Sequence, residues 1–195
     1  MKRLVFVTLL LLLGASSFAQ KSGYEKCIEI NSGAGLDDYQ KYTFGIGMIN
    51  GYRQDAFFLG VGVGYEYLRG LYYKTLIYRG SALPTERESS YCTRNNLQVY
   101  GRLKADLSKT KVSPFLSVDL GYNIGLSDNE IKMANGFFFE PAFGIDFIVN
   151  EEQTIYFSIG YNGQNYDFEY ITTLSGTHME NKLAGKINAR FGFKF

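Results

Sequence analysis

The only histidine of this chain, His178, lies between a possible nucleophile, Ser175, and a possible acid, Glu180. A hydroxyl, an imidazole and a carboxylate so close together could support nucleophilic acyl transfer. They fall in an expected loop without strand-borne spacing, however, so we interpret His178 as a solvated loop residue. Metal sites need clustered ligands, and one histidine with two distant cysteines, Cys27 and Cys92, does not supply a cluster. The sequence therefore predicts no catalytic residue, no metal site, no cofactor and no enzymatic activity.

Overall charge gives no indication of a nucleic-acid partner. The chain has 20 basic and 19 acidic residues; without Lys2 and Arg3, which belong to an expected signal peptide, 18 basic residues face 19 acidic ones. A formal charge of −1 does not favour nucleic acid or an anionic membrane surface as a partner. The 22 glycines form no phosphate-binding loop between a strand and a helix.

Charged residues recur at every second position of several long segments and alternate there with apolar residues. Because successive side chains of a strand point to opposite faces, such charges share one face. This set comprises Glu29, Glu66, Arg102, Lys104, Asp106, Asp119, Glu140, Asp146, Lys186, Arg190 and Lys194. Its five cations and six anions could line an ion-selective pore or could pair with one another as a plug.

The segment Leu183–Phe195 shows how such charges would be positioned. Every second residue back from Phe195 is apolar or small, and the intervening positions carry three cations. A strand that crosses a bilayer needs roughly 9–11 residues, whereas a typical soluble strand has about 5–6. This length and alternation predict a strand with lipid on one side and a polar interior on the other.

Seven earlier segments repeat this pattern. We expect strands at Glu25–Leu36, Tyr42–Ile49, Phe57–Tyr67, Asn95–Leu107, Pro114–Gly125, Gly136–Val149 and Thr154–Asn162. In lipid only a closed barrel satisfies every backbone group, so the first and last strands should pair. The sequence therefore predicts an all-β fold, an eight-stranded antiparallel up-and-down transmembrane barrel. Eight strands enclose space that side chains can fill, and buried charges are tolerated when paired, so we favour the plug and a filled lumen.

The expected connections alternate in length. Short turns are expected at Asn50–Asp55, Ser108–Ser113 and Asn150–Gln153, and the longest connections span 69–93 and 163–180. Short periplasmic turns and longer external loops are typical of such barrels. The first half of 69–93 still has a strand pattern, so the third strand could project beyond the membrane, and Tyr166–Thr172 could likewise extend the seventh strand. Loops 69–93 and 163–180 are the expected sites for an extracellular ligand.

Two details of the strands have consequences. Pro141 lies mid-strand and must cost a ladder hydrogen bond, so a local bulge is expected there. Cys27 and Cys92 should lie toward opposite ends of the barrel, across much of an apolar band about 25 Å tall. A disulfide needs Cα atoms within about 7 Å, so we expect no Cys27–Cys92 bond.

The first nineteen residues have the features of a secretory signal peptide. Lys2 and Arg3 precede an apolar run at Leu4–Leu13, and small residues follow at Ser17 and Ala19. This predicts export and cleavage between Ala19 and Gln20. Residues 1–19 are thus the expected signal peptide and 20–195 the barrel domain.

The signal peptide, the eight alternating segments and the terminal aromatic strand resemble the small OmpA/OmpX-like outer-membrane β-barrels, including the porin-family barrels of Bacteroidota. The resemblance covers the whole mature chain and implies a cell outer-membrane location, with lipid as the surroundings. It also implies that the barrel-assembly machinery recognises the terminal strand, through Phe191, Phe193 and Phe195. The expected role is structural or adhesive, through external loops. Alternatives are a narrow pore, a lipid-modifying enzyme or a soluble lipocalin-like barrel.

Overall fold

The computed structural model describes residues 22–36, 42–77, 86–126, 136–150, 153–172 and 176–195; for 70–77, 86–92, 166–172 and 176–182 it describes the backbone only. The expected signal peptide lies outside the described residues. The strands are β1 (Gly23–Gly35), β2 (Tyr42–Gln54), β3 (Phe57–Ile77), β4 (Glu86–Asp106), β5 (Val112–Gly125), β6 (Gly136–Ile148), β7 (Thr154–Thr172) and β8 (Gly176–Lys194). No helix within these ranges is long and apolar enough to cross a membrane.

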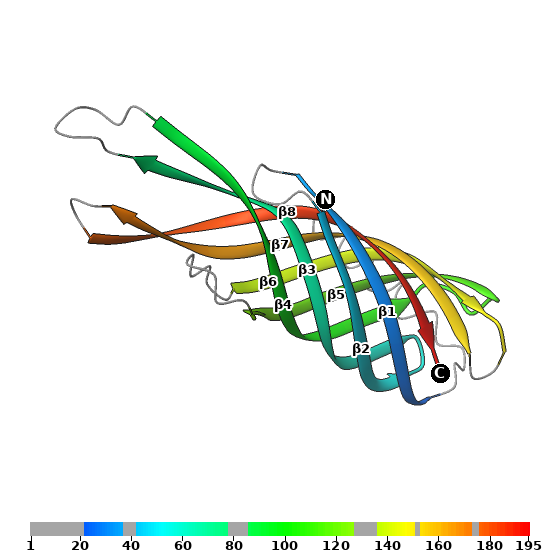
Figure 1. Cartoon of the computed structure of the whole chain (residues 1–195). Helices are drawn as coiled ribbons and strands as arrows, with labels where there is room; N and C mark the ends of the chain where they lie inside the picture. The colour runs from blue at the N-terminus through cyan, green and yellow to red at the C-terminus, as the bar shows by residue number, and fades with distance from the viewer. Residues whose placement is uncertain (1–21, 37–41, 78–85, 127–135, 151–152, 173–175) are drawn as a thin grey trace, which may run out of the picture.

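The eight strands close into one barrel in sequence order, which confirms the predicted fold class (Figure 1). Closure is made by β1 and β8, which pair antiparallel from Cys27 opposite Lys194 to Gly35 opposite Lys186. Every other neighbouring pair is also antiparallel. Sequence-adjacent strands therefore pair throughout, as expected for an up-and-down barrel.

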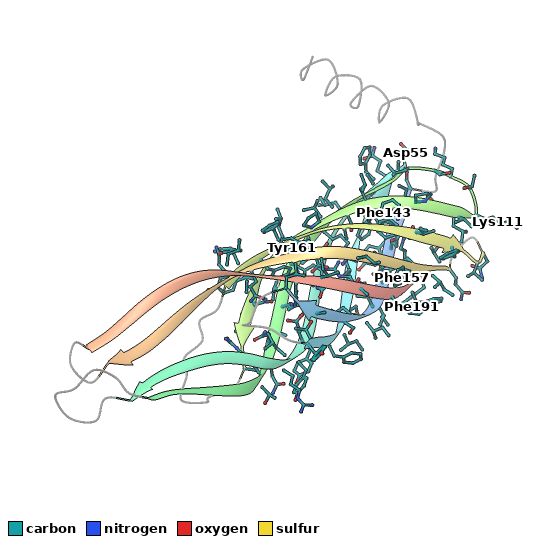
Figure 2. All side chains as sticks on the ribbon, turned by 90° about the horizontal axis from the view of Figure 1, so that it is seen from above. Asp55, Lys111, Phe143, Phe157, Tyr161 and Phe191 are labelled. Atoms are coloured by element: carbon teal, nitrogen blue, oxygen red, sulfur yellow. The ribbon has the colours of Figure 1, made fainter. Side chains whose placement is uncertain are left out.

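Alternate residues face outward and inward, and the outward surface is apolar. Leu59 and Val61 are each 67% exposed, and Phe137 is 72% exposed. Figure 2 shows Phe143, Phe157 and Phe191 on the outside of the wall. Lys26 lies on the outside near one end of the barrel, and Arg69 lies on the outside near the other end. At the levels between these two residues, the outward positions of the described strands carry no charged residue. A belt of this kind is suited to contact with hydrocarbon.

The two ends of the barrel differ (Figure 1). At the short-turn end, β2 connects to β3 through Asp55 and Ala56, β4 connects to β5 through residues 107–111, and β6 ends at Ile148 just before β7 begins at Thr154. At the hairpin end, β3–β4 and β7–β8 extend past the other strands. Asp55 has φ 52°, the left-handed conformation that two-residue hairpin turns require. The turn predicted at Asn50–Asp55 was therefore too long, because β2 continues to Gln54.

The strands at the hairpin end correct the two predicted long loops. Pairing of β3 with β4 runs from Leu71 opposite Cys92 to Ile77 opposite Glu86, beyond an irregularity between Arg69 and Leu71. The predicted strand pattern in the first half of 69–93 is confirmed, because β3 extends past the end of β2; that it projects beyond the membrane stays a prediction. Pairing of β7 with β8 likewise reaches Thr172 opposite Gly176. Most of 69–93 and 163–180 is therefore β-hairpin rather than loop.

Pro141 interrupts a ladder without a bulge. β6 and β7 pair at Phe139 opposite Gly163 and again at Ala142 opposite Gly160, and the register is the same on both sides of the gap. The carbonyl of Pro141 points toward Gly160, so its ring nitrogen also faces β7. The missing N–H explains the gap, and the predicted bulge was wrong because no residue is inserted.

Candidate functional site: the charged barrel interior

All eleven charged residues predicted to share one face are buried inside the barrel. They are Glu29, Glu66, Arg102, Lys104, Asp106, Asp119, Glu140, Asp146, Lys186, Arg190 and Lys194. Each lies on an inward position of its strand because the period-two pattern is unbroken through the barrel wall. The structure gathers nine of them into two groups, which we call the central belt and the short-turn belt. The other two, Glu66 and Lys186, form a separate ion pair.

The central belt is built around Arg102, whose guanidinium lies between two carboxylates. It donates from Nε and Nη2 to the two oxygens of Asp119, at 2.7 Å each. It also donates from Nη1 and Nη2 to the oxygens of Glu29, at 2.7 and 3.1 Å. Two bidentate pairs use the fork geometry of arginine fully. Arg102 and Asp119 are opposite each other on β4 and β5, whereas Glu29 comes from β1, across the interior.

Arg190 completes the central belt and allows two acids to lie side by side. Asp119 and Glu140 are opposite each other on β5 and β6, an arrangement that is destabilising for unscreened like charges. Arg190 contacts both, with Nη1–Oδ2 and Nη2–Oε1 distances of 2.6 Å. Asn162 and Asn188 also donate to Glu140, at 2.7 and 2.8 Å. Every acid of the belt thus has a cationic partner.

The short-turn belt begins with Arg53, which joins three strands. Its Nε donates to Glu25 at 2.7 Å, and its Nη1 pairs with Asp106. Lys104 in turn contacts Asp106 at 2.9 Å. The chain of alternating charges then continues from Lys104 to Asp146.

The belt ends at Lys194, the penultimate residue of the chain. Its ammonium and that of Lys104 both contact Oδ2 of Asp146, at 2.5 Å. The Lys104 ammonium also lies 4.1 Å from the ring centroid of Phe115, within the range of a cation–π contact. Six charges from β1, β2, β4, β6 and β8 are therefore connected across the barrel near its short-turn end.

Glu25, Arg53 and Arg94 are buried or half-buried charges that the sequence analysis missed. Arg53 was assigned to a turn, and Arg94 lies one residue outside the predicted strand. Glu25 was within a predicted strand on the correct face. With them, the interior of the described barrel contains equal numbers of acids and bases. The acids are Glu25, Glu29, Glu66, Asp106, Asp119, Glu140 and Asp146, and the bases are Arg53, Arg94, Arg102, Lys104, Lys186, Arg190 and Lys194.

Two buried tyrosines contact the central belt through Glu29. Tyr100 donates to Glu29 at 3.0 Å, and Tyr156 also donates to Glu29. Both rings have a glycine facing them: a Cβ at Gly62 would lie 2.5 Å from the Tyr100 ring, and one at Gly192 would lie 2.1 Å from the Tyr156 ring. These glycines are therefore needed for close approach of the rings to the wall.

Cys27 is buried beside Tyr156 and is a free thiol, in agreement with the prediction that it does not bond to Cys92. Its sulfur donates to the Tyr156 hydroxyl at 3.3 Å. Cys92 lies in the projecting part of β4, opposite Leu71.

A cavity of about 560 Å³ opens at the short-turn end, and residues of the short-turn belt line its inner part, including Glu25, Arg53 and Lys194. A smaller space of about 10 Å³ is lined by residues of both belts, including Lys194 and Arg102.

Of the residues considered for enzymatic chemistry, the structure describes His178 and Glu180 by their backbone only. His178 lies in β8, opposite Tyr170, and not in the predicted loop. Ser175 lies outside the described residues. Within the described ranges, no group of three or more histidine, cysteine or acidic residues is placed to hold a metal ion.

The terminal aromatics Phe191, Phe193 and Phe195 are all exposed on the outer surface. The Phe193 and Phe195 rings stack with centroids 5.9 Å apart. Phe195 continues the β1 ladder beyond the last residue of β8, because its N–H donates to the Lys26 carbonyl at 2.9 Å and its carbonyl accepts from Lys26 at 3.0 Å.

No family model and no curated protein sequence matches this chain. Solved structures do. Neisserial surface protein A is 12% identical with a TM-score of 0.56, over 90% of this chain and 98% of that one. The outer membrane protein OprG from Pseudomonas aeruginosa is 11% identical with a TM-score of 0.57, over 91% and 98%. The outer membrane enzyme PagL is 12% identical with a TM-score of 0.50, over 85% and 97%. The chain thus has the fold of small outer-membrane β-barrels.

Proposed function

We propose that this chain is an integral outer-membrane barrel that anchors two projecting hairpins for contact with an extracellular partner. The uncharged outward belt and the likeness of fold to outer-membrane barrels support membrane insertion. Export would use the signal peptide, with cleavage between Ala19 and Gln20. The assembly machinery would recognise the terminal strand with Phe191, Phe193 and Phe195.

The observation that carries this proposal is the extension of two hairpins beyond the wall. The last β2–β3 pair is Tyr42 opposite Arg69, yet β3 and β4 stay paired out to Ile77. Strand length beyond the apolar belt is not needed to cross a bilayer. An ordered projection on a rigid scaffold is a common place for binding residues.

The barrel interior favours an anchor over a pore. The central belt spans the interior through Arg102, with bidentate contacts to acids on both sides, and its charges have protein partners that a passing ion would have to displace. In planar bilayers we therefore expect conductance at the level of the bare membrane. Stable channels from the refolded protein would favour the pore instead.

Two deletions test the role of the hairpins. One variant replaces 70–92 with a two-residue Asn-Gly turn, and its matched partner replaces 166–182 in the same way. The central and short-turn belts lie outside both segments, so both variants should still form a barrel, seen as a heat-modifiable band on gels of unheated samples. Adhesion of cells to immobilised collagen, fibronectin and mucin should fall in at least one variant. Folded variants that both retain full adhesion would refute the proposal.

A further inference from the structure

In the described part of the chain, the projecting part of the β3–β4 hairpin has no strand beside either of its outer backbone edges. β3 loses its β2 neighbour after Arg69, and β4 pairs with β5 only from Asn96 inward. Among the described residues, Leu71–Ile77 and Glu86–Cys92 therefore pair only with each other. Alternate residues on each outer edge leave N–H and C=O groups available for another strand.

The two edges differ in charge. Leu71–Ile77 contains one charged residue, Lys74, among β-prone residues, whereas Glu86–Cys92 begins with Glu86, Arg87 and Glu88. Natural edge strands are commonly protected from pairing by charges, and the β3 edge has little such protection. A partner strand that places acidic residues opposite Lys74 would complement the charge of the β3 edge. The outer edge of β4 has that composition.

The directions of the two strands also allow the β3 edge of one copy to pair with the β4 edge of a neighbouring copy. All copies in one membrane share an orientation, with β3 running toward the hairpin tip and β4 running back (Figure 1). The β3 edge of one copy and the β4 edge of the next are therefore antiparallel. Two β3 edges would meet in parallel, a pairing that is slightly less stable per residue.

We propose that Leu71–Ile77 of one copy pairs with Glu86–Cys92 of a second copy, with Lys74 opposite Glu88. This register places 71–76 opposite 91–86, and six residues at about 3.3 Å each give a ladder of roughly 20 Å. Each copy has one edge of each kind, so the contact is heterologous and extends into rows instead of closing as a dimer. This inference goes beyond the proposed function but rests on its placement of the hairpins outside the cell.

Cysteine cross-linking tests the pairing and its register. In a Cys92→Ser background, Lys74→Cys and Glu88→Cys are made as separate variants; Cys27 stays because it is buried. Directly opposed residues of an antiparallel pair have Cα atoms about 4.5–5.5 Å apart, which suits a disulfide. Cells that produce both variants should form disulfide-linked dimers on mild oxidation, and either variant alone should form none. A chain with both substitutions should give a ladder of multimers.

A matched control uses the other hairpin, with Glu169→Cys and Lys182→Cys produced together, and should give only the collision background. Dimers from Lys74→Cys alone, or mixed disulfides with a different protein, would overturn the proposal. Accessibility of both positions is measured with a membrane-impermeant maleimide on intact cells. If both positions are labelled but cross-linking stays at the background level, the pairing proposal is refuted and the proposed function is not affected. If the maleimide labels neither position, the external placement of the hairpins fails as well.

Discussion

Replacing Arg102 with methionine should be among the most destabilising single changes in this barrel. The methionine keeps much of the side-chain length but removes the cation between two carboxylates. Asp119 is 0% exposed and Glu29 is 2% exposed, so neither acid can turn to solvent. Both lose bidentate partners at 2.7 Å.

The magnitude follows from the charges that remain. The central belt has three acids, Glu29, Asp119 and Glu140, and two bases, Arg102 and Arg190. Its formal charge changes from −1 to −2 when Arg102 is lost. Removing one partner of a buried pair costs about 3–5 kcal/mol, and we expect a loss in that range for Arg102→Met. Asp119→Asn brings the belt to zero and keeps one acceptor oxygen, so its cost should be smaller, about 1–3 kcal/mol.

Urea unfolding of the refolded protein in lipid vesicles would measure both values, with gel mobility of unheated samples as the readout of folding. Lys26→Met is the control, because it removes the same charge from an exposed outward position and should change stability by no more than about 0.5 kcal/mol. If Arg102→Met unfolds at the same urea concentration as Lys26→Met, the belt does not hold the barrel as described. A larger loss for Asp119→Asn than for Arg102→Met would refute the charge argument specifically.

Other substitutions probe the wall. Gly192→Ala should cost about 1–3 kcal/mol, because its Cβ would lie 2.1 Å from a buried tyrosine ring and overpacking is destabilising; Gly101→Ala, with no atom nearer than 3.9 Å, should be nearly neutral by urea unfolding. Pro141→Ala should raise stability by about 0.5–1.5 kcal/mol by restoring one ladder hydrogen bond, and an unchanged or lower unfolding midpoint would contradict this. Phe195→Asp should reduce the membrane-assembled fraction on fractionation far more than Leu107→Asp, an equivalent change at the same end; equal levels would argue against a terminal assembly signal.

The faces of the strands could be predicted from sequence because two different environments act on alternate residues. Outward residues such as Leu59 and Val61 and inward residues such as Glu66 have opposite requirements, and the pattern repeats every second residue. The ends of the strands were harder to predict from the sequence. Asn50-Gly51 has the composition of a turn, but Gly51 is opposite Gly60 in a continuous ladder.

The reason for that glycine lies in packing. A Cβ at Gly51 would lie 2.6 Å from the ring of Phe58 and 2.3 Å from the Leu59 carbonyl. A small residue is needed at position 51 so that these groups can approach the backbone closely. The local sequence cannot distinguish a glycine required for such packing from a glycine required for a turn. The same misreading placed Arg53 in a turn and hid its contact with Glu25.

The hairpins were only partly predictable, for a different reason. We propose that the hairpins lie outside the bilayer, where no hydrocarbon selects apolar residues on one face, so the contrast between alternate positions weakens. Asp167 and Glu169 alternate with aromatic residues in β7, which allows 166–172 to extend the seventh strand, yet without a lipid belt to compare them with, this pattern does not separate the segment from the loop predicted at 163–180. His178 was assigned to a loop for the same reason.

The sequence alone does not show which charged residues pair with one another. These pairs nevertheless restrict the register of the strands. Arg102 and Asp119 are direct neighbours on β4 and β5, but Glu29 reaches Arg102 only because β1 closes the barrel against β8. A one-residue slip of β4 would move Arg102 to the lipid face and an apolar residue into the belt. Because a buried ion pair adds little net stability compared with apolar packing, we infer that the main effect of the belts is to make such slipped registers unfavourable. That inference accounts for a costly set of buried charges in a barrel whose outer surface alone would tolerate several registers.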